Sequence, residues 1–357
     1  MLGPDDPVVL FQHHGLDNLS GKTGLTLLRY RPGPVLAVLD PSHAGASLRQ
    51  VCGIDREVPV LASLAEALPL LPSQRRAVAV VGLAPSGGRL PQELRADLVA
   101  ALQAGLCVAS GLHTRLGDDP ELAALCRPGS WIWDLRREPA DLPVASGRAA
   151  LLPCRRVLTV GSDMSVGKMS ACLELQAAAL RAGRDARFVG TGQAGILISG
   201  SGVALDAVRV DWAAGGVEQA VLQAAAGATA DTLVLVEGQG SLCHPGSTAT
   251  LPLLRGSQPT ALLLVHRAGQ RTIRNQEHVP LPPVPQLIAT LEALAALGRP
   301  AEAAAPPPRV VAIALNTGHL PEQEARAAIA AMADLTGLPC ADPVRQGGEA
   351  LLPVLLA

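Results

Sequence analysis

The fold is decided by residues 155–170, which read Arg155-Arg-Val-Leu-Thr-Val-Gly-Ser-Asp-Met-Ser-Val-Gly-Lys-Met-Ser170. The pattern predicts an apolar strand over 157–160, a loop over 161–167 and a helix over 171–180. A strand that leads through a glycine-bounded loop to Gly-Lys and a helix is typical of a phosphate-binding loop, or P-loop. Glycine lets backbone N–H groups approach phosphate oxygens, the helix N-terminus adds a partial positive charge, and the lysine adds a full one.

The loop departs from the standard P-loop spacing. Five residues separate Gly161 from Gly167 where four are usual, and Met169 stands between Lys168 and Ser170. Lys168 is one of only two lysines in a chain rich in arginine, which indicates that a compact ammonium is needed there. The alternative is a glycine-rich turn with a solvated lysine. The predicted cofactor-binding residues are Gly161, Ser162, Asp163, Ser165, Val166, Gly167, Lys168, Met169 and Ser170.

Composition excludes several classes of protein. The 357 residues are 48% hydrophobic and 2% aromatic, with a net charge of −2. A net charge this small does not indicate a nucleic-acid or membrane-surface partner. The low aromatic content leaves no platform on which the bases of single-stranded nucleic acid could stack. The chain contains no uninterrupted apolar run of about 18 residues, so no membrane span is predicted. The seven scattered cysteines contain no Cys-x-x-Cys pair, which predicts reduced thiols in a cytoplasmic protein.

Strands and helices alternate along the first part of the chain. Buried strands are predicted at 7–11, 34–39, 77–82 and 106–110, with helices at 63–71 and 91–104. This order predicts an α/β, Rossmann-like domain built on a parallel sheet. No Gly-x-Gly-x-x-Gly follows the first strand, so dinucleotide binding has little support. The alternative is a structural domain that shapes one wall of a cleft.

The boundary between two domains is predicted near residue 150. Residues 127–148 contain several prolines and read as an irregular connection. The chain therefore divides into a Rossmann-like N-terminal domain, 1–150, and a P-loop NTPase-like, parallel-sheet C-terminal domain, 151–357.

A second functional signal lies at the end of an apolar strand. Residues 231–237 read Asp-Thr-Leu-Val-Leu-Val-Glu, and a glycine follows. In P-loop proteins an acid at the end of a neighbouring strand meets the metal ion or its water. Glu237 and Ser170 would therefore hold Mg²⁺ if the reaction uses it. A buried structural carboxylate is the alternative for Glu237.

Two further segments are predicted to approach a ligand. Residues 187–200 read as strand, glycine-rich loop and strand, with the backbone near Gln193 free to come close to a ligand. Another strand ends at His266 and Arg267, at the edge where α/β sheets bind ligands. His266 could equally be a hydrogen-bonded core histidine.

Several motifs are similar to known families. Residues 161–168 and Val236-Glu-Gly-Gln-Gly-Ser241 resemble the paired motifs of dethiobiotin synthetases. A longer resemblance, over nearly the whole chain, is to a former domain of unknown function that is now linked to D-glutamate N-acetyltransferases. It rests on residues 82–91, 110–113, 166–170, 190–198, 236–245, 256–259, 265–267 and 316–317.

The resemblance implies a Rossmann-like domain joined to a P-loop domain, and an acyltransferase that moves acetyl from acetyl-CoA to the amine of D-glutamate or a related amino acid. The P-loop would hold the phosphates of coenzyme A, and the activated thioester would need no ATP. The amine is protonated at pH 7, so a base must take its proton. The catalytic candidates are Glu237, His244 and Asp163.

The remaining contacts are expected around the same loops. Backbone N–H groups near Gly192 and Gly195 would stabilise the oxyanion, and Arg267 and Arg255 would clamp the carboxylates of the acceptor. The predicted substrate-binding residues are Gln193, Gly195, Gln239, Ser241 and Arg267. The expected partners are this small-molecule substrate and further copies of the chain in a homo-oligomer.

Three other functions compete with this one. An ATP- and Mg²⁺-dependent ligase or kinase of dethiobiotin-synthetase type would use Lys168 and Glu237. A non-enzymatic nucleotide sensor would bind without turnover. An NAD-dependent dehydrogenase would use the first domain, which lacks the dinucleotide fingerprint.

Overall fold

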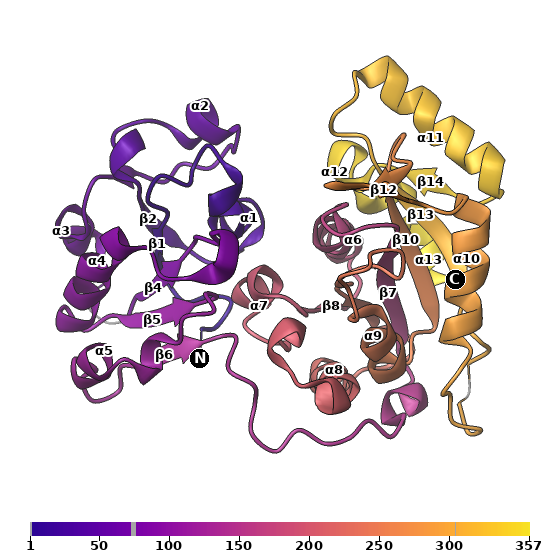
Figure 1. The fold of residues 1–357 in the computed structure, drawn as a ribbon, viewed down its shortest axis with the longest axis horizontal. Helices are drawn as coiled ribbons and strands as arrows, with labels where there is room; N and C mark the ends of the chain where they lie inside the picture. Colours follow the sequence, from indigo (N-terminus) through magenta and orange to yellow (C-terminus); the bar gives the residue numbers. More distant parts are fainter. Residues whose placement is uncertain (1, 73–75, 304) are drawn as a thin grey trace. The chain divides into compact units, whose positions relative to one another are not determined.

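The computed structural model describes residues 2–72, 76–303 and 305–357, which form two compact units (Figure 1). The N-terminal unit comprises Met1–Glu138 and Gln193–Gly200, and the C-terminal unit comprises Pro139–Gly192 and Ser201–Ala357. The chain first passes from one unit to the other at 138/139, within the stretch 127–148 that was expected to be an irregular connection. No helix of the described residues has the length and apolarity needed to cross a membrane.

The N-terminal unit contains a six-stranded parallel sheet. Its strands are β1 Val8–Phe11, β2 Val35–Leu39, β3 Val60–Leu61, β4 Val78–Val81, β5 Cys107–Ser110 and β6 Ile132–Asp134. They lie in the order β3-β2-β1-β4-β5-β6, so the order reverses between β1 and β4. This is the strand order of a Rossmann-like domain, as the alternating pattern predicts. Strand β6 lies within the stretch expected to be irregular, because a three-residue strand beside prolines, with two partly exposed residues and one buried acid, carries no readable pattern.

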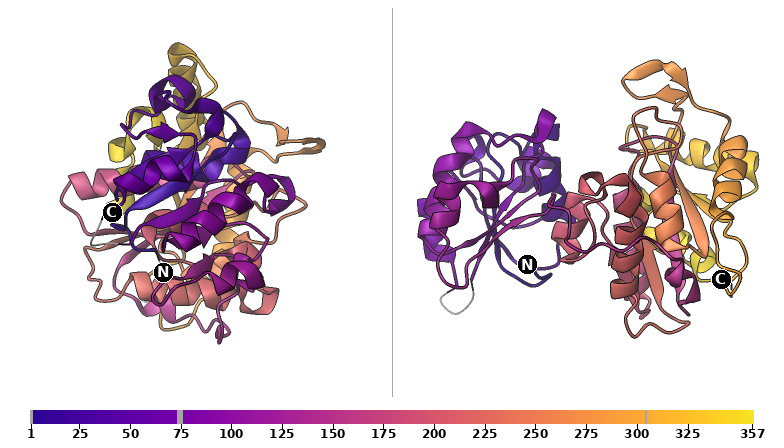
Figure 2. Two further views of the ribbon diagram at one scale, coloured as in Figure 1. Left: turned by 90° about the vertical axis from the view of Figure 1, so that its left-hand side faces the viewer. Right: turned by 60° about the horizontal axis from the view of Figure 1, so that its bottom comes forward.

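Helices cover both faces of this sheet (Figures 1 and 2). They are α1 Lys22–Tyr30, α2 Leu48–Cys52, α3 Leu64–Ala67, α4 Gln92–Gln103 and α5 Pro120–Ala124. Apolar residues of α4 recur at helical spacing and pack against the sheet, with Leu94, Leu98 and Leu102 fully buried. Burying this aliphatic face is what stabilises the unit.

Helix α7, Gln193–Ser199, is where the sequence prediction was wrong. A strand was expected because Ile196-Leu197-Ile198 is a short, β-branched apolar run, which periodicity cannot distinguish from a buried helix. The structure shows a helix that packs against α1 in the N-terminal unit. Arg31 donates to the carbonyl of Leu197 at 2.8 Å, which satisfies a carbonyl near the end of the helix. Tertiary contacts therefore override local propensity here.

The C-terminal unit contains a second six-stranded parallel sheet. Its strands are β7 Arg155–Gly161, β8 Ala186–Val189, β9 Leu233–Val236, β10 Ala261–Arg267, β13 Val310–Asn316 and β14 Cys340–Ala341. Their order is β14-β13-β10-β7-β9-β8, which places β7 between β10 and β9. The P-loop that follows β7 therefore has a strand end on each side, and the predicted P-loop architecture is confirmed.

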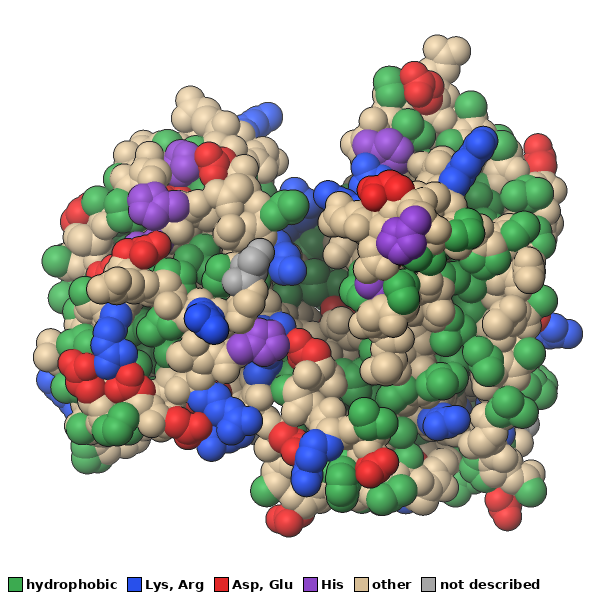
Figure 3. Space-filling model, viewed as in Figure 1, with side chains coloured by type: hydrophobic (Ala, Val, Ile, Leu, Met, Phe, Trp, Pro, Cys, Tyr) green, Lys and Arg blue, Asp and Glu red, His purple; other side chains and the backbone are tan. Residues whose placement is uncertain are grey.

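Helices lie on both faces of the second sheet as well (Figures 1 and 2). They are α6 Lys168–Arg181, α8 Val210–Ala224, α9 Thr250–Ser257, α10 Val284–Ala295, α11 Glu322–Thr336, α12 Pro343–Gln346 and α13 Leu352–Leu356. A small antiparallel hairpin, β11 Thr272–Ile273 and β12 Gln276–Pro280, follows β10. On the face drawn in Figure 3, acidic and basic side chains are interspersed over each unit, in keeping with the net charge of −2.

A close backbone contact holds residues 139–147 against α8, and it generates a prediction for two adjacent glycines. A Cβ at Gly215 would lie 1.6 Å from the carbonyl oxygen of Pro143, whereas one at Gly216 would meet side-chain carbons at 3.2 Å and beyond. Ala gains roughly 1 kcal/mol over Gly in a helix, but overpacking costs about 1–3 kcal/mol. Gly215→Ala should therefore lower the free energy of unfolding in a denaturant titration, and Gly216→Ala should leave it within about 1 kcal/mol. Equal effects of the two substitutions would contradict this account.

Candidate functional site

The P-loop leaves β7 at Gly161 and enters α6 at Lys168. Gly167, directly before the helix, has φ 111°, a conformation that residues with a Cβ rarely adopt. Ser165 also has a positive φ, 55°. The loop thus turns back on itself and brings its backbone to the N-terminus of α6, where anions are stabilised. The predicted sequence of strand, glycine-bounded loop and helix is confirmed.

Lys168 lies inside the loop rather than in solvent. The side chain is buried, and its Nζ donates to the carbonyl oxygen of Asp163 at 2.8 Å. Burial lowers the pKa of Lys168 to about 8, while the charges of Asp163 and Glu237 act in the opposite direction. The alternative of a merely solvated lysine is therefore wrong.

The carboxylate of Asp163 braces the loop. Its Oδ1 accepts from the N–H of Met164 at 2.6 Å. Its Oδ2 accepts from Nε2 of Gln270 at 2.6 Å and from the N–H of Arg274, in the β11–β12 turn, at 2.8 Å. Asp163 was predicted both as a phosphate contact and as a reserve base. Two of these three hydrogen bonds, from Gln270 and Arg274, hold the loop to the hairpin segment.

Two neighbouring strand ends support the loop from other sides. Asn316, at the end of β13, donates to the carbonyl of Val166 at 2.9 Å. Ser241, in the segment after β9, donates to the carbonyl of Ser162 at 2.9 Å. Such bonds fix the loop before any ligand arrives, which reduces the ordering cost of binding.

Glu237 follows β9 and is buried beside the loop. Its Oε2 accepts from the N–H of Thr191 at 2.8 Å and from the N–H of Gly192 at 3.2 Å. Burial raises the pKa of Glu237 to about 7, although these two N–H groups and the charge of Lys168 favour the ionised form. A carboxyl group with a pKa near neutrality can both accept and release a proton at working pH. The Gly192 N–H is engaged here, so it is not free for the predicted oxyanion contact.

His266 lies directly beneath the loop. Its Nδ1 is 2.8 Å from Oγ of Ser162, and the ring is buried. Burial lowers the pKa of His266 to about 4, so the imidazole is neutral at pH 7. Of its two interpretations, the hydrogen-bonded core histidine fits these contacts.

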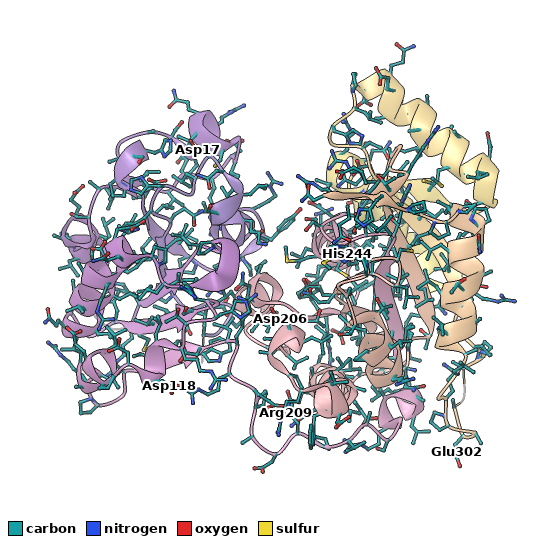
Figure 4. The ribbon with its side chains drawn as sticks, in the orientation of Figure 1. Asp17, Asp118, Asp206, Arg209, His244 and Glu302 are labelled. Carbon is teal, nitrogen blue, oxygen red and sulfur yellow. The ribbon has the colours of Figure 1, made fainter. Side chains whose placement is uncertain are left out.

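His244 lies on the loop that follows β9 (Figure 4). Its Nδ1 accepts from the N–H of Gly246 at 3.0 Å, so the neutral ring carries its proton on Nε2, which is a hydrogen-bond donor. Arg267 ends β10 and is half-buried, and Ser170 lies in the first helical turn of α6. These residues, with Gln239, belong to the C-terminal unit that holds the P-loop.

Gln193 and Gly195 belong instead to the N-terminal unit. Nε2 of Gln193 donates to Oγ1 of Thr23 at 2.9 Å, and its Oε1 accepts from Arg136 at 2.7 Å. Gln193 is thus built into that unit by both ends of its amide group. No local pattern predicts this, because Thr23 and Arg136 are far from Gln193 along the chain.

Some residues that position the loop were missed from the sequence. Gln270 and Arg274 lie in a short polar hairpin without strand-like alternation. Thr191 lies in the segment 187–200 that was expected to approach a ligand, but its role as an N–H donor to Glu237 was not predicted. Only the rule that ligands bind at the carboxyl ends of parallel strands could have pointed to these segments.

Comparison with known families covers both units. Residues 143–352 match the family described as "Domain of unknown function (DUF1611_C) P-loop domain". Residues 41–138 match "Domain of unknown function (DUF1611_N) Rossmann-like domain". The chain belongs to the DUF1611 family.

Two relatives of this chain are named D-glutamate N-acetyltransferase. The protein from Tritonibacter scottomollicae is 35% identical over 356 residues, 99% of each chain. The protein from Pseudoalteromonas sp is 34% identical over 275 residues, 76% of this chain and 79% of its own. A crystal structure of a DUF1611 family protein from Anabaena variabilis has 51% sequence identity and a TM-score of 0.89, with 99% of both chains covered. The predicted family resemblance is confirmed.

The pKa of Glu237 predicts how stability depends on pH. Its pKa rises from 4.5 to about 7 on folding, so the folded state holds the proton more tightly. The resulting stabilisation is complete below pH 4.5 and is lost as the pH rises through 7, by roughly 3 kcal/mol in total. Denaturant titrations across this window should show the loss in the wild-type protein relative to Glu237→Gln. A difference between the two proteins that does not change with pH would contradict the assignment.

Proposed function

We propose that this protein is an N-acetyltransferase that moves an acetyl group from acetyl-CoA to the amine of D-glutamate or a closely related amino acid. The observation that carries the proposal is the 35% identity to the D-glutamate N-acetyltransferase of Tritonibacter scottomollicae over 99% of both chains. Because the similarity spans both domains, it concerns the whole protein rather than a shared P-loop alone.

The P-loop supports acetyl-CoA as the donor. Coenzyme A carries a diphosphate and a 3′-phosphate, and backbone N–H groups at a helix N-terminus bind such groups without hydrolysing them. Lys168, held inside the loop, adds a positive charge. The thioester is already activated, so the transfer requires no nucleotide triphosphate.

The reaction needs one base. The amine must lose a proton before its nitrogen attacks the thioester carbonyl. The new C–N bond then replaces the C–S bond, and coenzyme A leaves as a thiolate that takes up a proton. Glu237 is supported as the base by its buried position beside the P-loop and by a pKa of about 7.

An ATP- and Mg²⁺-dependent ligase or kinase is the second candidate, and one observation favours it. Glu237 follows β9, the strand paired with β7, where P-loop enzymes place the acid that meets Mg²⁺. Ser170, in the first turn of α6, would be the hydroxyl ligand. That function requires ATP consumption and loss of activity on chelation of Mg²⁺.

An assay of thiol release from acetyl-CoA decides between these functions. Purified protein is tested with D-glutamate, L-glutamate or no acceptor, each with and without ATP and Mg²⁺. We expect release that depends on D-glutamate and is indifferent to ATP. Consumption of ATP without thiol release under any condition would refute the acetyltransferase and favour the ligase.

The two lysines of the chain provide a matched pair for testing the P-loop. Lys168→Ala removes a charged hydrogen-bond donor to phosphate and should weaken acetyl-CoA binding about 10- to 100-fold in a calorimetric titration. Lys22→Ala, on α1 of the N-terminal unit, should leave the affinity within about twofold. Unchanged binding of both acetyl-CoA and ATP by Lys168→Ala would exclude the loop as the phosphate site.

A further inference from the structure

A large cavity lies within the C-terminal unit beside the P-loop. Its volume is about 1010 Å³, at the upper end of the range for small-molecule sites. Met164 of the P-loop and Gln239 of the segment after β9 line it, and so does one face of α9. Residues 144–147, residues 298–300 and the segment that leads into α8, on which Asp206 is labelled in Figure 4, form its other sides. The cavity therefore extends from the phosphate-binding loop along α9.

Arg255 of α9 brings a positive charge to this cavity. Its side chain is exposed, and its guanidinium has no hydrogen bond or ion pair with any residue that the structure describes. Side chains on a helix lean toward its N-terminus, which for α9 is the end nearer the segment after β9. A guanidinium without a partner in a cavity suits a carboxylate, which it can bind through two parallel hydrogen bonds.

Gln258, one turn further along, provides an unpaired acceptor. Its Nε2 donates to the carbonyl of Arg255 at 2.9 Å and to the carbonyl of Gly298 at 3.0 Å, which fixes the orientation of the amide group. Its Oε1 is left buried without a donor among the described residues, although Gln258 lines the cavity. Gln258 also has φ 42° at the C-cap of α9, a position usually taken by glycine. The acceptor is closed off from solvent, so Gln258 contributes to this wall by fixing the end of α9 rather than by binding a ligand itself.

Acidic side chains stand across from this wall. Asp206, on the segment that leads into α8, and Asp211, in the first turn of that helix, also line the cavity. The charge of Asp206 contributes to the raised pKa of Glu237, so these two carboxylates are within electrostatic reach of each other. The cavity therefore presents a cationic group at α9 and anionic groups where the chain enters α8. Arg299 also lines it, but its guanidinium donates to the carbonyls of Pro259 and Ala305. A zwitterion with a second carboxylate complements that arrangement.

We infer that this cavity binds the acyl acceptor as an acidic α-amino acid, with its side-chain carboxylate on Arg255 and its amine toward Asp206 and Glu237. The inference rests on the proposed function, because it names where the acceptor of that reaction sits. Arg255 is then the residue that selects an acidic side chain, and Gln258 is a positioning residue that holds the end of α9. The remaining volume leaves room for the acyl-bearing arm of the donor.

Arg255→Ala tests the site, with Arg326→Ala on the exposed face of α11 as the matched control. We expect the KM for D-glutamate to rise at least 30-fold while the KM for acetyl-CoA stays within twofold. Arg255→Lys, which keeps the charge, should restore part of the loss. The control should match the wild type, and thermal melting should show that both variants fold.

Direct binding separates failure of this inference from failure of the proposed function. D-glutamate is titrated into the protein without acetyl-CoA, and glutarate serves as a probe that keeps both carboxylates but lacks the amine. Loss of binding of both compounds in Arg255→Ala supports the site, even if no thiol release is found. Acetyl transfer with an unchanged KM for D-glutamate in Arg255→Ala overturns the site alone. A raised KM for acetyl-CoA with an unchanged KM for D-glutamate assigns the cavity to the donor and also overturns it.

Discussion

Burial of the Lys168 ammonium within its own loop is the constraint on which the site depends. An ammonium taken out of water needs acceptors and negative charge, and the loop provides the carbonyl of Asp163 at 2.8 Å. The nearby carboxylates of Asp163 and Glu237 oppose the loss of its proton. A phosphate group would supply the same kind of partner, with more charge. The loop thus encloses the Lys168 ammonium, which can also form an ion pair with an anionic ligand.

The residues around the loop have two different roles: some hold the loop in place, and one can exchange a proton. Asp163, Asn316 and Ser241 tie the loop to a hairpin and to two strand ends, and their polar atoms are used in doing so. Glu237 differs, because burial leaves it close to half-protonated at neutral pH. A rigid loop beside a carboxyl group that can exchange a proton is the combination that acyl transfer to an amine requires.

The sequence was sufficient for features encoded locally. The glycine-bounded loop, the strand before Glu237 and the alternation of the first domain depend on neighbours in the chain, so their patterns are readable. Helix α7 was misread because its apolar run fits a strand equally well, and only its burial against α1 selects the helix. The hydrogen bonds by which Asp163 holds the loop could not be predicted either, since its partners at 270 and 274 come from a hairpin segment without periodicity. Contacts between distant segments carry no signature in one sequence.

The placement of α7 has a consequence for how the chain can be divided. The chain passes from one unit to the other at 138/139, again at 192/193 and back at 200/201. No single cut releases two complete units, because a fragment that ends at 138 lacks the helix that covers α1, and its complement carries that helix without a partner. A single cut after 138 would therefore separate the N-terminal unit from the helix that packs against α1.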